Sequence, residues 1–119
     1  MTITYQIHGV RNNHGYVRGA AFVQDNGGFP EDAQKATAVS QTVARTGSVS
    51  LTFKLPSYTT HAAFAFYHDE KQIGRIEKGF FGIPKCGITL SNWNGRSRPK
   101  FSSAYTPLKK VMQAKLKYF

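Results

Sequence analysis

The chain has one cysteine, Cys86, and only six acidic residues among 119. A single cysteine excludes an internal disulfide framework and a zinc site built from several cysteines. No apolar run reaches the ~18 residues that a membrane-spanning helix needs, so we expect no transmembrane segment. Six acidic residues stand against 16 basic ones, which gives a net charge of +10. An excess of this sign favours anionic partners but does not define the fold.

The positive charge is concentrated toward the end of the chain. Glu77 is the last acidic residue, and nine Lys and Arg residues follow it. One interpretation is a solvated basic surface that keeps the protein soluble. The other is a binding surface for nucleic acid, an anionic glycolipid or another anionic polymer.

Apolar residues make up 40% of the sequence, with nine Phe, six Tyr and one Trp, which is enough to fill the core of one domain spanning residues 1–119. The pattern from Thr2 to His8 alternates, with Ile3, Tyr5 and Ile7 on one side. This period of two predicts a half-buried strand.

Further strands are expected over 16–23, 36–44, 48–55, 60–68 and 100–106. Residues 108–119 are compatible with a strand or a helix, and a strand is preferred because the neighbouring elements are strands. The turn-forming residues Asn12–Gly15 predict a hairpin between the first two strands. Pro30–Ala33 is compatible with one helical turn. Residues 69–99 read as one long irregular segment. Together these features predict an all-β fold, an antiparallel β-sandwich of about seven strands that is immunoglobulin- or transthyretin-like.

A tryptophan lies close to three basic residues between positions 93 and 100. Such a group can stack a sugar or a base while the cations hold an anion; alternatively, the Trp closes one end of the sandwich and the basic side chains are solvated. In the last strand, the odd-numbered lysines are expected to share the face opposite the core. The candidate residues for binding an anionic ligand are therefore Trp93, Arg96, Arg98, Lys100, Lys109, Lys115 and Lys117.

No catalytic group can be assigned from the residues. The four histidines lack metal-ligand spacing and are interpreted as surface or loop residues. His68 beside Asp69 is the best catalytic candidate, but no nucleophile motif accompanies it. Cys86 follows Lys85, whose charge could lower the pKa of the thiol, yet a plain small loop residue is favoured. Phe80–Phe81 is either a plug of the core or an exposed aromatic tip, and the core position is favoured.

Three segments resemble a bacterial family: His68–Glu77, Gly82–Gly87 and Leu90–Asn92, followed by Pro99, Phe101 and Ala104. On these motifs the chain is similar to the domain-of-unknown-function 2141 family. The resemblance implies a small β-sandwich that is usually exported behind a signal peptide and has no established activity.

One loop departs from the pattern of that family. The family's loop resembles a calcium loop with oxygen ligands at alternate positions. Here Lys71 and Ile73 replace two of those ligands, and the remaining carboxylates are Asp69, Glu70 and Glu77. We therefore expect no metal site in this degenerate loop. Instead, Asp69 and Glu77 are predicted to pair with Lys71 or Arg75.

The sequence thus favours a non-enzymatic binding or structural module of the bacterial envelope, with no cofactor and a basic surface for anionic ligands. The first alternative is a nucleic-acid-binding β domain. The second is a small metal-dependent or hydrolytic enzyme that uses His68 and Asp69. Because a strand follows Met1 directly and no signal-peptide pattern is present, two locations stay open: the protein is cytoplasmic, or it is periplasmic or secreted after removal of a leader.

Overall fold

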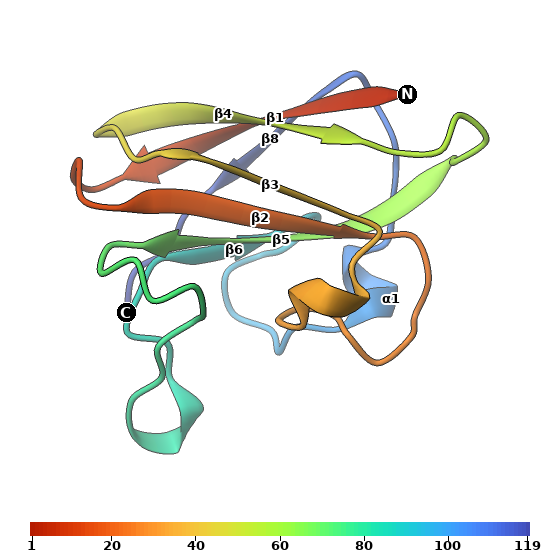
Figure 1. The fold of residues 1–119 in the computed structure, drawn as a ribbon. Helices are drawn as coiled ribbons and strands as arrows, with labels where there is room; N and C mark the ends of the chain where they lie inside the picture. Colours follow the sequence, from red (N-terminus) through yellow and green to blue (C-terminus); the bar gives the residue numbers. More distant parts are fainter.

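The computed structural model describes residues 1–119 and contains eight strands and three short helical segments (Figure 1). In chain order these are β1 (Thr2–Val10), β2 (Tyr16–Phe22), η1 (Ala33–Lys35), β3 (Ala38–Val43), β4 (Gly47–Lys54), β5 (His61–Asp69), η2 (Phe80–Gly82), β6 (Ile88–Leu90), α1 (Phe101–Ala104), β7 (Thr106–Pro107) and β8 (Val111–Lys115). None of the helices is long and apolar enough to cross a membrane.

The strands form two sheets that face each other, which confirms the predicted β-sandwich. One sheet has the order β4-β1-β8, and the other has the order β3-β2-β5-β6 with β7 added to β5 (Figure 1). The pairing is antiparallel except between β1 and β8, which run parallel.

The predicted hairpin between the first two strands is wrong. β1 pairs with β4 and β8, whereas β2 pairs with β3 and β5. The turn at Asn12–Gly15 instead carries the chain from one sheet to the other. Its position is fixed by Asn13, whose side-chain oxygen accepts hydrogen bonds from the backbone nitrogen and the hydroxyl of Thr46, at 2.7 and 3.0 Å.

Two predicted elements in the second half also differ. Residues expected to form a strand from 100 to 106 contain the helical turn α1 and only the first residue of the two-residue strand β7. The segment expected to be irregular contains β6, which pairs with β5. β6 is only three residues long, so it shows no alternation that a sequence pattern could reveal.

The core lies between the sheets and is rich in aromatic residues. Tyr5 from β1 packs against Phe64 and Phe66 from β5, with ring centroids 4.7 Å apart in both cases. Close approach at this point depends on Gly19 in β2, because a Cβ atom there would lie 2.6 Å from the Phe66 ring and 2.9 Å from the Phe53 ring.

The outer face of the five-stranded sheet positions the candidate site. Three connections extend from this side of the sandwich: residues 23–37, 70–87 and 91–100 (below the sheet in Figure 1). They surround the outward-facing side chains of β2, β3, β5 and β6. The opposite sheet has no such cover, and its outer face is polar along β1 and β4.

Candidate binding groove

A groove with a volume of about 1160 Å³ lies on the outer face of the five-stranded sheet. Part of its floor is an apolar row that crosses four strands in register: Val39, Ala20, Ala65 and Leu90. The two central positions of the row are alanines, whose short side chains leave space above the sheet. The floor is therefore apolar and recessed.

A second row runs beside the first and adds polar groups. It consists of Gln41, Arg18, Tyr67 and Ile88, again in register across the four strands. The Arg18 guanidinium donates hydrogen bonds to Asp69 and to the side chain of Gln41. The floor thus combines aliphatic and aromatic surface with one fixed cation.

The walls come from the three connections around the sheet. Trp93 and Pro99 form one wall, Phe81 and Ile83 a second, and Pro30 lies on the third. Across the groove, the Lys78 ammonium lies 2.6 Å from a carboxylate oxygen of Glu31, and this ion pair links segment 70–87 to segment 23–37.

The wall that carries Trp93 is ordered by its own hydrogen bonds. The indole Nε1 donates to the carbonyl of Ser97 at 2.8 Å. The Asn94 side chain accepts from the backbone nitrogens of Arg96 and Ser97 at 2.8 and 3.0 Å. Lys117 donates to the Gly95 carbonyl at 2.6 Å and ties this loop to the end of the chain. The half-buried Trp93 ring is therefore held in place before any ligand arrives.

The groove is rimmed by positive charge from several parts of the chain. Six basic residues line it: Arg18, Arg75, Lys78, Arg96, Arg98 and Lys100. Glu31 is the only acidic residue among the lining side chains. Arg18 and Lys78 have carboxylate partners, but the other four take part in none of the ion pairs. Their charge is available to an anion.

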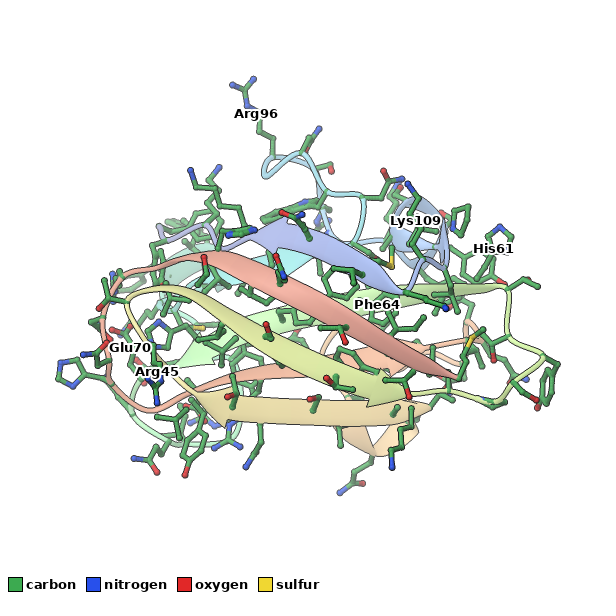
Figure 2. The ribbon with its side chains drawn as sticks, turned by 90° about the horizontal axis from the view of Figure 1, so that it is seen from above. Arg45, His61, Phe64, Glu70, Arg96 and Lys109 are labelled. Atoms are coloured by element: carbon green, nitrogen blue, oxygen red, sulfur yellow. The ribbon has the colours of Figure 1, made fainter.

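Four of the predicted ligand-binding residues meet in this groove, namely Trp93, Arg96, Arg98 and Lys100. Figure 2 shows Arg96 extending from its loop away from the body of the molecule.

The three predicted lysines of the C-terminal segment do not form one patch. Lys109 lies at the end of the molecule near His61 (Figure 2). Lys115 is six residues further along, about 20 Å of extended chain. Lys115 and Lys117 line a separate hollow, which shares Leu90, Trp93 and Gly95 with the groove.

Asp69 anchors the loop that corresponds to the calcium-like loop of the family. Its two carboxylate oxygens accept hydrogen bonds from the backbone nitrogens of Ile73 and Gly74, at 2.9 and 2.8 Å. The same carboxylate lies 2.8 Å from Arg18. Burial alone would raise the pKa of Asp69, but the Arg18 hydrogen bond, the two amides and the Arg18 charge outweigh it and hold this pKa below its ordinary value.

The other two carboxylates of the loop point to different partners. Glu70 pairs with Arg11 at 2.6 Å, and Glu77 pairs with Lys71 at 3.1 Å. The predicted pairing of Glu77 with Lys71 is confirmed, whereas Asp69 pairs with Arg18 rather than with a residue of the loop. No group of three or more His, Cys, Asp or Glu side chains is arranged to hold a metal ion.

The interpretation of His68 as a surface or loop residue is wrong. Its side chain is fully buried, with Nδ1 2.7 Å from the Tyr118 hydroxyl and Nε2 2.8 Å from the carbonyl of His14. Asp69 projects to the other face of the sheet, because neighbouring residues in a strand alternate. The two side chains therefore do not form a catalytic pair.

Cys86 lies in the connection between η2 and β6, as expected for a loop residue, and its side chain is buried. Burial raises the pKa of its thiol, contrary to the lowering considered from Lys85.

Phe80 and Phe81 do not plug the core. They are 89% and 99% exposed, at the tip of segment 70–87. The Ile83 nitrogen donates to the Phe80 carbonyl at 3.2 Å, and the Gly79 nitrogen donates to the Ile83 carbonyl at 2.7 Å. The segment therefore ends in a tight hairpin turn with two bare aromatic rings.

Sequence reasoning missed the sheet's contribution to the groove. It did not assign Arg18, Tyr67 or Arg75 to a site. One signal was present, since the strand ending at His68 is apolar on both faces, with Ala63, Ala65 and Tyr67 opposite the core side. That pattern was interpreted as a central strand, which it is. The same pattern also indicates that the outer face of this strand is covered, in this structure by the connections that surround the groove.

Of the comparisons with known proteins, only the one with protein-family models gave a match. No curated protein and no solved structure matches the chain. A protein-family model described as "Uncharacterized protein conserved in bacteria (DUF2141)" matches residues 5–115, which is nearly the whole chain. The protein therefore belongs to this bacterial family, as its loop and glycine motifs had indicated.

Proposed function

We propose that the protein is a non-enzymatic binding module of the bacterial envelope, which holds an anionic amphiphile in the groove of its five-stranded sheet. The observation that carries this proposal is the combination of an apolar, recessed floor with a cationic rim in one groove. An apolar floor stabilises a hydrocarbon or aromatic body by removing it from water. The rim offers hydrogen-bonded and Coulombic contacts to an anionic head.

The rim favours a phosphate, sulfate or carboxylate head. Arg75, Arg96 and Arg98 come from two loops and have no carboxylate partner. Guanidinium groups present planar pairs of donors that match such oxyanions. An envelope role is supported by the resemblance to exported proteins, and envelope surfaces present amphiphiles of this type.

Single-stranded nucleic acid is the alternative that shares the cationic rim. It requires a series of aromatic rings on which successive bases stack. The floor of the groove is instead mostly aliphatic, with Tyr67 as its outward-facing ring, whereas Trp93, Phe81 and Phe119 line the groove from outside the sheet. The amphiphile is therefore the better match to the composition of the floor.

The test uses monododecyl phosphate below its micelle concentration, with dodecyl maltoside and inorganic phosphate as probes of the tail alone and the head alone. We expect the phosphate amphiphile to bind most tightly, as measured by calorimetry, and its affinity to fall as salt is added. Equal binding of all three probes, or tighter binding of an oligonucleotide, would contradict the proposal.

Two substitutions on one strand provide a matched pair. Val39 and Val43 both lie on β3, are 61% and 55% exposed, and differ in that Val39 lines the groove while Val43 does not. Val39→Asp places a negative charge at the binding surface and is expected to weaken binding of monododecyl phosphate about tenfold or more. Val43→Asp should leave the affinity within about twofold. If both variants bind alike, the ligand does not occupy the groove.

A further inference from the structure

The tip of segment 70–87 is a second surface that the groove does not explain. Phe80 and Phe81 expose almost their entire side chains, and Ile83 beside them is 50% exposed. Large apolar side chains at a protruding tip are unfavourable in water and gain nothing from the fold. Phe80 does not line the groove at all. The groove therefore does not account for the exposure of this pair of rings.

The backbone conformation at the tip is unusual for a bulky residue. Phe81 adopts φ +60°, a left-handed conformation, and is followed by Gly82 at φ +73°. Tight hairpin turns with two such residues prefer Asn or Gly at the first position, because a bulky side chain is strained there. The sequence thus keeps a large aromatic residue at a position where folding favours a small polar one. Departures of this kind are typical of functional positions.

The surroundings of the tip are basic. Between residues 71 and 87 there are four basic residues, Lys71, Arg75, Lys78 and Lys85, and one acidic residue, Glu77. Glu77 pairs with Lys71, and Lys78 pairs with Glu31 of another segment. Arg75 and Lys85 have no ion-pair partner. The tip is thus apolar and flanked by free positive charge.

We propose that this hairpin docks the protein onto an anionic lipid bilayer, with Phe80 and Phe81 inserted among the lipid headgroups. A stable protein partner would need a contact of about 800 Å² on each side, whereas a hairpin tip offers only a few side chains. A bilayer needs no such area, because buried apolar rings and basic residues near an anionic surface add their contributions. This docking surface shares Arg75, Phe81 and Ile83 with the groove, whereas Phe80 and Lys85 lie outside it. Docking does not depend on the groove's ligand.

The test measures sedimentation of the protein with vesicles. One set contains phosphatidylcholine mixed with phosphatidylglycerol at about two to one, and the other contains phosphatidylcholine alone. We expect clear binding to the mixed vesicles and much weaker binding to the neutral ones. Lys85→Gln, at a basic residue that lies outside the groove, should weaken binding to the mixed vesicles only, by about fivefold. A parent protein that does not bind the mixed vesicles overturns the proposal.

The aromatic contribution is tested with substitutions that leave the core untouched. Phe80→Ser is expected to weaken binding to the mixed vesicles about tenfold, and Phe80→Ser with Phe81→Asn still more. Tyr58→Ser is the matched control, because Tyr58 is 84% exposed in the connection between β4 and β5. It should bind as the parent does. Equal losses from Phe80→Ser and Tyr58→Ser, or no loss from the double variant, refute docking through the tip.

Insertion has its own readout. A Phe81→Trp variant, made in a Trp93→Phe background, reports the polarity around the tip through its fluorescence. A blue shift on addition of mixed vesicles is expected, and an unchanged spectrum refutes insertion. Val39→Asp, which is designed to disrupt the groove, should retain vesicle binding. The groove and the docking tip can therefore fail independently.

Discussion

Replacing Asp69 by Asn tests the structural basis of the loop that bears both the groove wall and the tip. Asn keeps the size of the side chain and can still accept from the Ile73 amide. It loses the charge and one acceptor oxygen. With Nδ2 in place of Oδ2, the side chain presents a donor to the donors of Arg18 and Gly74, so both hydrogen bonds are lost. Hydrogen bonds to a charged group each contribute about 1.5–3 kcal/mol.

The Asp69 side chain is 2% exposed, but that of Arg18 is 22% exposed and regains water. We therefore expect a loss of about 2–4 kcal/mol from the free energy of unfolding, less than the full sum of two bonds. At about 4 °C per kcal/mol, the melting temperature should fall by roughly 8–16 °C. Asp25→Asn is the control, since Asp25 is exposed and makes none of the ion pairs. It should change stability by no more than about 0.5 kcal/mol.

The pH dependence of this loss has a defined sign. The pKa of Asp69 is lower in the folded protein than its ordinary value of about 3.9 in an unfolded chain. The unfolded state therefore takes up a proton first as the pH falls, and the stabilisation by Asp69 is complete above pH ~4 and lost below it. Urea unfolding should show a constant gap between parent and Asp69→Asn from pH 7 to about 5, and a narrowing gap below about 4. A variant as stable as the parent at pH 7, or a gap that widens in acid, would refute this account of the loop.

Three further changes test other parts of the structure. Melting temperatures in excess calcium and in chelator should agree, whereas a metal at ~100 times its dissociation constant would add about 2.7 kcal/mol of stability; a calcium-dependent rise of several degrees would show that Asp69 and its neighbours still bind the ion. Phe81→Asn should leave the free energy of unfolding unchanged or raise it by up to about 1 kcal/mol, because Asn tolerates the left-handed conformation. A lower melting temperature of this variant would mean that the Phe81 ring packs against the rest of the protein. Gly19→Ala should cost about 1–3 kcal/mol in urea unfolding, since the new methyl group meets Phe66; parental stability would show that the sheets separate easily there.

The strands could be predicted from the sequence because their patterns are strong. Alternation in β1 and β4 and the two-sided apolar pattern of β5 are local signals, and they placed these strands within one or two residues. Pairing is not a local property. The segment around Asn12–Gly15 has the composition of a hairpin turn, yet the strands that it joins lie in different sheets. Only the packing of the two layers distinguishes a hairpin from a crossing.

Only the part of the candidate site that is local in the sequence could be predicted. Trp93, Arg96 and Arg98 are close in sequence, so their common location in one wall follows from the chain itself. Arg18 and Arg75 reach the groove from β2 and from segment 70–87, and nothing in the sequence relates them to Trp93. The Phe80–Phe81 pair was wrongly placed because an aromatic pair is usually buried. Its exposure follows from the tight turn at Gly82, which directs both rings outward.

The groove and the hairpin tip are neighbouring surfaces, and they extend from the same side of the sandwich (Figure 1). Phe81 and Ile83 connect them, because both residues lie on the groove wall and near the tip. A protein docked through Phe80 and Phe81 would therefore bring the cationic rim close to the lipid headgroups. An anionic amphiphile in that layer has its head at the level of Arg75 and the other rim residues, and its apolar part within reach of the groove floor. The proposed ligand and the proposed docking surface are thus chemically consistent. Val39→Asp tests the groove alone and Phe80→Ser tests the tip alone, whereas Arg75 and Phe81 belong to both surfaces.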